Sequence, residues 1–134
     1  EKYDLAEKYF KVAVSVGNEE ALNELGVLFY VQKKYDQAVI FYKSAIENGD
    51  INAMFNLGLL YEDQNKMNLA ITYYEKAAAL GSGDAFIRLG NIFMNKNDIE
   101  TARKYFQKAK NLGNKNADYM LELLENSVTE RLDS

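Results

Sequence analysis

The strongest constraint on the fold is that the sequence repeats itself every 32 residues. The first half of the unit holds alanine, then leucine four residues later, glycine directly after the leucine, and an aromatic residue three positions further on. The matching positions are Ala21, Ala53, Ala85 and Ala117; Leu25, Leu57, Leu89 and Leu121; Gly26, Gly58 and Gly90, replaced by Glu122 in the last copy; and Phe29, Tyr61 and Phe93. A period of roughly 20–50 residues is typical of stacked repeats in which each unit contacts only its neighbours.

The second half of the unit repeats at the same period. Its positions are Ala6, Ala38, Ala70 and Ala102; Phe10, Tyr42, Tyr74 and Phe106; Ala13, Ala45, Ala77 and Ala109; and Gly17, Gly49, Gly81 and Gly113. In both halves the repeated apolar residues stand three or four apart, which is the spacing of one helix face. Strand signals are absent, so each unit is predicted to be a pair of antiparallel helices.

The residues between these helices predict where each helix ends. The last glycine of each unit suits the left-handed position just after a helix, and the residue that follows it is a preferred N-cap in every copy. These N-cap candidates are Asn18, Asp50, Ser82 and Asn114. Within the unit, Asn65 and Asn97 stand in polar turns where a left-handed conformation is expected.

The sequence therefore predicts an all-α, right-handed solenoid of about eight helices, forming a single domain over residues 1–134. Residues 18–49, 50–81 and 82–113 are predicted to be full repeats. Residues 1–17 match only a second helix, so its apolar side with Leu5, Phe10 and Val14 is expected to be uncovered and the parent protein to be longer. Residues 114–134 match a capping first helix and tail, because a last helix without a partner does not need the glycine.

Gly26 raises a separate question, because glycine inside a helix costs about 0.5–1 kcal/mol relative to alanine. A local hinge would explain one such glycine. Its recurrence at Gly58 and Gly90, each behind the same leucine, favours instead a close approach of the paired helix at this position.

The pattern Leu25-Gly26-x-x-Phe29, followed by Ala38, Tyr42 and Ala45, resembles the tetratricopeptide repeat, whose period is about 34 residues. The junction from Ala78 through Gly81 to Leu89-Gly90 is similar to the Sel-like branch of that superfamily. The chain lacks tryptophan and proline, including the proline that usually stands near the end of a tetratricopeptide repeat. The resemblance implies a protein-binding scaffold with its first helices on a concave wall.

The amino-acid composition excludes several classes of catalytic and metal-binding site. Without cysteine or histidine, disulfides, thiolate catalysis, Cys/His zinc sites and Ser-His-Asp triads are excluded. No catalytic constellation remains, so neither an enzyme, a metal site nor a cofactor is expected. The net charge of −4 disfavours nucleic acid, and no apolar run reaches the roughly 18 residues of a membrane span. No secretory signal opens the sequence, and a cytoplasmic location is favoured.

Partner-binding residues are expected at the first-helix positions outside the core columns. These candidates are Asn23, Val27, Tyr30, Phe55, Asn56, Leu59, Ile87, Arg88, Asn91 and Met94. Because several are apolar, they predict an exposed groove for a peptide or helix of a partner protein. Two alternatives stay open: neighbouring helices or tight curvature cover these residues, or the chain self-associates through the groove or its uncovered first segment.

Some tetratricopeptide domains hold a peptide's carboxylates with a set of lysine, asparagine and arginine side chains on three successive first helices. The matching positions here are Asn23 and Val27, then Asn56, then Asp84 and Arg88. Only Asn56 and Arg88 agree with that set, and Asp84 would repel a carboxylate. A complete carboxylate clamp is therefore not expected.

Overall fold

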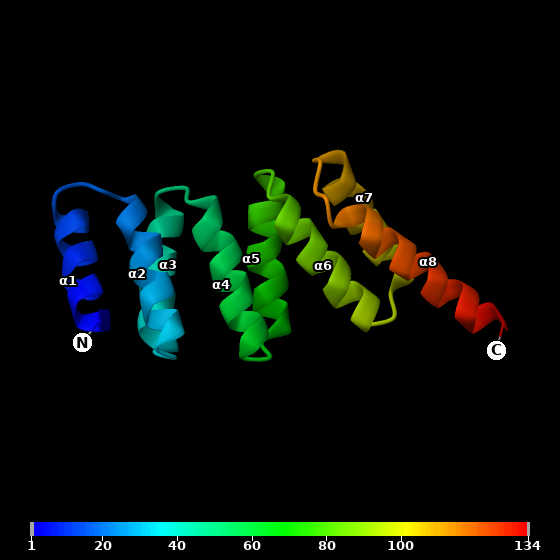
Figure 1. Cartoon of the computed structure of the whole chain (residues 1–134), viewed down its shortest axis with the longest axis horizontal. Helices are drawn as coiled ribbons and strands as arrows, with labels where there is room; N and C mark the ends of the chain where they lie inside the picture. Colours follow the sequence, from blue (N-terminus) through cyan, green and yellow to red (C-terminus); the bar gives the residue numbers. More distant parts are fainter. Residues whose placement is uncertain (1, 134) are drawn as a thin grey trace. The chain divides into compact units, whose positions relative to one another are not determined.

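The computed structural model describes residues 2–133, which form eight α-helices and no strand (Figure 1). The predicted helical class and number of helices are confirmed. The helices are α1 (Lys2–Ser15), α2 (Glu20–Val31), α3 (Tyr35–Glu47), α4 (Ile51–Asp63), α5 (Met67–Ala79), α6 (Gly83–Asn95), α7 (Ile99–Asn111) and α8 (Ala117–Asp133).

The chain divides into two compact units, residues 1–73 and 74–134, with the boundary inside α5. In the first unit α2 packs against α1, α3 and α4, and α3 also contacts α4. In the second unit α6 packs against α7 and α8, and α7 contacts α8. Each unit therefore builds its core from neighbouring helices in the sequence, as expected for a repeat array.

The repeated columns form the core of both units. Leu25, Leu57 and Tyr42 of these columns are buried in the first unit, and Leu89, Tyr74 and Phe106 are buried in the second. The alanines of the second-helix columns, Ala38, Ala45, Ala102 and Ala109, have no exposed surface. Small residues at these places let paired helices approach closely, so the periodic residues are packing residues.

The glycine column faces a large ring. A Cβ atom placed on Gly26 would lie closer than 3.0 Å to ring atoms of Tyr42, and one on Gly90 equally close to the ring of Phe106. Real Cβ atoms do not approach that closely, so only glycine fits while the ring stays in place. The prediction of a close helix approach is confirmed at these two glycines, and burial raises the pKa of the Tyr42 hydroxyl.

The predicted turn conformations are also confirmed. Gly17, Gly49, Gly81 and Gly113 all have a positive φ between 80° and 99°. Asn65 and Asn97 are left-handed, with φ of 60° and 66°, and Lys33 at the matching place of the first full repeat has φ 61°. Lys33 was not expected there, because the prediction rested on asparagine rather than on the period.

Two of the four predicted N-caps are confirmed. The side chains of Asp50 and Ser82 accept hydrogen bonds from the backbone N–H groups of Ala53 and Ala85. Asn18 does not cap α2, which begins after Glu19. The side-chain oxygen of Asn114 accepts from the backbone N–H of Asn116, just before α8 begins, and its amino group donates to Asp84.

The N-terminal helix is the least buried part of the first unit. None of the described residues of α1 is buried, and Leu5 is 73% exposed. Phe10 and Val14 are half-buried, so the expected uncovered side is confirmed for Leu5 and is only partial for the other two. None of the helices in the described part of the chain combines the length and apolar character that crossing a membrane requires.

Candidate partner-binding surface

A pair of asparagine side chains links two first helices of the first unit. The Nδ2 atom of Asn56 on α4 donates to Oδ1 of Asn23 on α2 at 3.1 Å, in a partly buried position. This bond uses one amide hydrogen of Asn56 and the carbonyl oxygen of Asn23. The amino group of Asn23 and the carbonyl oxygen of Asn56 are the chemically complementary groups that the pair does not consume.

Tyr30 on α2 is held in place by two neighbours. Its hydroxyl donates to the carboxylate of Asp63 at the end of α4, and its ring lies edge-on to Tyr35 at a centroid distance of 5.8 Å. Its hydroxyl therefore serves to join α2 to α4, and the half-buried ring forms one end of the α2 part of the surface.

The apolar candidates of the first unit lie outside the fully buried columns. Val27 on α2 is 39% exposed, and Phe55 and Leu59 on α4 are half-buried. Val27 and Leu59 directly follow the buried Gly26 and Gly58, and Phe55 stands two residues before the buried Leu57, so all three lie beside the fully buried columns and not in them. They give the surface an apolar character beside the asparagine pair.

The candidates of the second unit lie on α6 and are more closely tied to packing. Ile87 and Met94 pack against a core cluster formed by Ala102, Phe106 and Leu124. For these two, neighbouring helices supply part of the cover, as the alternative interpretation expected.

The polar candidates on α6 differ from those two. Arg88 is exposed. The Oδ1 atom of Asn91 is buried and accepts no hydrogen bond from the described residues. A buried carbonyl oxygen without a donor is costly in a folded protein, so this position of Asn91 lowers the stability of the second unit.

A small apolar cavity of about 260 Å³ lies between α1 and α2. Phe10, Glu24, Val27, Leu28 and Val31 line it. Of these, only Val27 was among the predicted partner-binding residues. Comparison of α2 with α4 would have revealed Glu24, Leu28 and Val31. The matching residues of α4 are Asn56 and Asp63, which bond to α2, and Leu60, which is buried.

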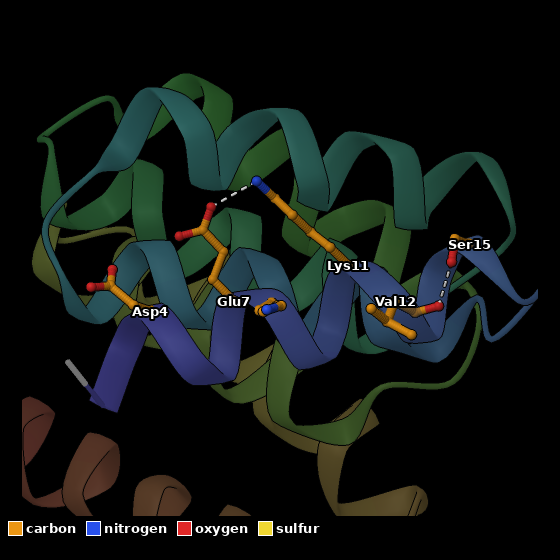
Figure 2. A pocket seen from close by; sticks show the side chains of 6 residues that line it. Asp4, Glu7, Lys11, Val12 and Ser15 are labelled. Atoms are coloured by element: carbon orange, nitrogen blue, oxygen red, sulfur yellow. Dashed lines mark hydrogen bonds and ion pairs between the residues drawn. The ribbon is translucent and has the colours of Figure 1, made fainter.

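A larger hollow, of about 450 Å³, runs along α1 alone and is lined by Asp4, Glu7, Lys8, Lys11, Val12 and Ser15. Figure 2 shows the ion pair between Glu7 and Lys11, 2.7 Å long, and the bond from the Ser15 hydroxyl to the Val12 carbonyl. All its residues come from one helix, and these polar groups already have partners on that helix. The hollow is therefore an open helix surface and carries no site.

Two residues at the positions of the carboxylate clamp already have local partners. Asp84 accepts a hydrogen bond from Nδ2 of Asn114 at 2.9 Å, and Asn56 is engaged with Asn23. The described residues contain no cluster of three acidic side chains that would hold a metal ion.

Two family models described as tetratricopeptide repeat match the sequence, one over residues 1–50 and the other over residues 51–80 and 83–116. The chain belongs to the tetratricopeptide-repeat family. A comparison with curated protein sequences found no match.

Similar solved structures agree with this family and with its Sel-like branch. The N-terminal domain of stress-induced protein-1 from C. elegans is 25% identical, has a TM-score of 0.70, and covers 80% of this tetratricopeptide chain and 94% of that domain. A Sel1 repeat protein from Oxalobacter formigenes is 25% identical with a TM-score of 0.71, over 91% of this chain and 58% of the other.

A third similar structure contains a ligand. It is the first tetratricopeptide domain of Spaghetti (RPAP3) bound to the HSP90 peptide SRMEEVD, 22% identical, with a TM-score of 0.68 and coverage of 83% of this chain and 93% of that one. At this identity the likeness concerns the fold.

Proposed function

We propose that this tetratricopeptide-repeat chain is a protein-interaction scaffold without catalytic activity, and that its α2–α4 surface binds a peptide segment of a partner protein. The observation that carries the proposal is the Asn23–Asn56 amide pair, flanked by Val27, Phe55 and Leu59. The peptide-bound structure of similar fold supports the class of ligand.

The amide pair favours an extended segment over a helix. Every backbone N–H and C=O of a bound segment needs a partner, and a helix satisfies most of these within itself. An extended segment can accept from the amino group of Asn23 and donate to the carbonyl oxygen of Asn56. The pair therefore hydrogen-bonds to the peptide backbone, and the apolar residues beside it contact the side chains of the partner.

Magnitudes show that both kinds of contact are needed. Because Val27, Phe55 and Leu59 are already partly covered, completing their burial contributes only about 1 kcal/mol each. Two neutral hydrogen bonds add about 0.5–1.5 kcal/mol each, while association costs an estimated 4–15 kcal/mol. Binding through this surface alone is expected to be weak, and contacts elsewhere on the chain must add to it for a stable complex.

The α6 surface of the second unit is proposed as a further contact. Arg88 supplies an exposed positive charge, which an acidic group on the partner would match. Ile87 and Met94 contribute the apolar part of this contact.

Selection from a displayed peptide library tests the proposal. Peptides chosen on the unmodified chain are expected to bind the Val27→Glu and the Asn23→Ala/Asn56→Ala variants at least tenfold more weakly, measured by calorimetry. The matched control is Asn48→Ala, an exposed asparagine that ends α3, which should bind as the unmodified chain does. Equal binding by all variants would exclude the α2–α4 surface.

A further inference from the structure

Asn48 and Gly49 stand at the junction between α3 and α4 (Figure 1). They form the only asparagine-glycine pair in the sequence. An asparagine side chain is attacked most readily by the next backbone nitrogen when the next residue is glycine, because glycine has no side chain to hinder the approach. By sequence, the Asn48 side chain is therefore the most reactive amide of the chain.

Repeat packing does not explain an asparagine at this position. The residues that precede the matching glycines of the other repeats are apolar and exposed, namely Val16, Leu80 and Leu112. The Asn48 side chain is exposed as well, and it forms no hydrogen bond within residues 2–133. No contact of the fold thus holds this amide away from a reaction.

The backbone of the folded junction keeps the two reacting groups apart. Asn48 has a ψ of 8°, which turns the Gly49 nitrogen toward the Asn48 nitrogen and away from the Asn48 side chain. The Gly49 N–H also donates to the Ile46 carbonyl at 2.9 Å. This bond must open before the main chain can rotate into the reactive arrangement, so the fold controls the rate.

Opening of this junction leaves the core intact. Asn48 and Gly49 are both exposed, and no atom lies within 4 Å of the place where a Cβ on Gly49 would stand. Exposed backbone hydrogen bonds at helix ends open far more often than a whole domain unfolds. The bond that secures the next helix is the one from the Ala53 N–H to the Asp50 carboxylate, at 3.1 Å.

We propose that Asn48 is a site of intramolecular deamidation in the native chain. The Gly49 nitrogen attacks Cγ of Asn48, so that an N–Cγ bond closes a succinimide ring while the Cγ–Nδ2 bond breaks. The proton lost from the Gly49 nitrogen leaves with Nδ2 as ammonia. Water then adds to either ring carbonyl and breaks its bond to nitrogen, which leaves aspartate or isoaspartate at position 48. The reaction needs no other reagent, and this inference does not depend on the α2–α4 peptide site.

Both products weaken the junction. A carboxylate at position 48 lies at the negative end of the α3 dipole and directly follows Glu47, which is unfavourable. Isoaspartate also adds a carbon atom to the main chain, so the N–H groups of Gly49 and Asp50 are displaced from their carbonyl partners on Ile46 and Ala45. The modification therefore loosens the connection between α3 and α4 irreversibly.

Mass spectrometry of the intact chain, aged at mildly alkaline pH and then digested with trypsin, tests the proposal. The peptide of residues 44–66 is expected to gain the mass of an amide-to-acid conversion, located at Asn48 by fragmentation, and to be labelled by isoaspartyl methyltransferase. The rate is expected to lie within about tenfold of the rate in urea, because the junction opens without global unfolding. Asn48→Ala is the matched control and should show neither change.

The Asp50→Ala variant tests the control by the fold. Loss of the cap on Ala53 loosens the junction, so Asn48 should deamidate at least threefold faster in the folded variant and at the same rate in urea. A native chain that keeps Asn48 intact while the unfolded chain is converted would overturn the proposal. So would earlier reaction at Asn52, an exposed asparagine of the same peptide, or a folded Asp50→Ala variant that reacts no faster.

Discussion

Helices α1 and α8 each match half of a repeat, and they differ in how much of their apolar surface is buried. Helix α1 is a second helix that leaves Tyr9 and Leu5 largely exposed, and α8 is a first helix whose one large apolar anchor, Leu124, is completely buried. Around α8 the polar residues are paired: Arg103 bonds to Glu125 at 2.8 Å and Lys110 to Asp118 at 3.1 Å. The apolar side of α1 is thus largely exposed, whereas α8 combines a buried leucine with paired polar groups on its surface.

The largest effect on stability is expected from the difference between α7, whose Phe106 is buried, and α1, whose Phe10 is half-buried. Phe106→Ala is expected to lower the free energy of unfolding by about 3–5 kcal/mol, because the ring is completely buried beside Gly90. Phe10→Ala should cost only about 1–2 kcal/mol, since half-burial recovers a fraction of the transfer free energy. Urea unfolding followed by circular dichroism measures both, and equal losses would mean that α1 is as well covered as α7.

The glycine column gives the next effect. Gly26→Glu places in α2 the residue type that α8 has at Glu122. It is expected to lower the free energy of unfolding by about 3 kcal/mol or more, because the Tyr42 ring must move and a charge becomes buried. The reverse change, Glu122→Gly, lies on an exposed helix position and should cost about 1 kcal/mol from helix propensity alone. Similar losses for the two changes would remove the proposed distinction between internal and terminal copies.

The ring that faces the glycine is Tyr42 at Gly26 and Phe106 at Gly90. Only the tyrosine can ionise, so alkaline pH is expected to destabilise the fold around Tyr42 and not around Phe106. Burial raises the pKa of Tyr42 in the folded chain, so its hydroxyl stays neutral when the unfolded chain ionises near pH 10. The stability that this group supplies is therefore present below pH 10 and falls as the pH rises further, by up to about 1.4 kcal/mol per pH unit. Tyr42→Phe should flatten that fall between pH 10 and 11, whereas Tyr119→Phe, at an exposed tyrosine, should not.

The ion pair between Arg103 of α7 and Glu125 of α8 is expected to have the smallest effect on stability. Glu125 raises the pKa of Arg103 chiefly through a hydrogen bond, but both side chains are substantially exposed. Surface pairs of this kind contribute about 0–1 kcal/mol and are screened by salt. Glu125→Gln should therefore lower stability by less than about 1 kcal/mol, with the difference shrinking in 1 M salt, and a larger loss would make the pair a structural part of the cap.

The period of the sequence explains why so much of the fold was predictable. Residues that recur every 32 positions, such as Leu25, Gly26 and Tyr42, have the same packing role in each copy, so each copy supports the assignment of the others. Lys33 was missed because its residue type does not indicate a left-handed turn, although Asn65 and Asn97 at the matching places do. The period was a better guide there than the chemistry of the side chain.

The candidate sites were less predictable for a physical reason. The Asn23–Asn56 bond depends on the register between two first helices, which a list of helix faces does not contain. Asn114 was predicted only as an N-cap, and its second bond, to Asp84 of another helix, was not predictable from the sequence. The predicted wall of ten residues remains a prediction.

Glycine in the first-helix column also acts as a positional label within the array. The first-helix copies at residues 26, 58 and 90 carry it, and the fourth copy carries Glu122 instead. Gene duplication of residues 50–81 would add another copy with glycine and preserve the register of its neighbours. A copy of α8 at the place of α2 or α6 would set a glutamate against the ring that Gly26 or Gly90 faces.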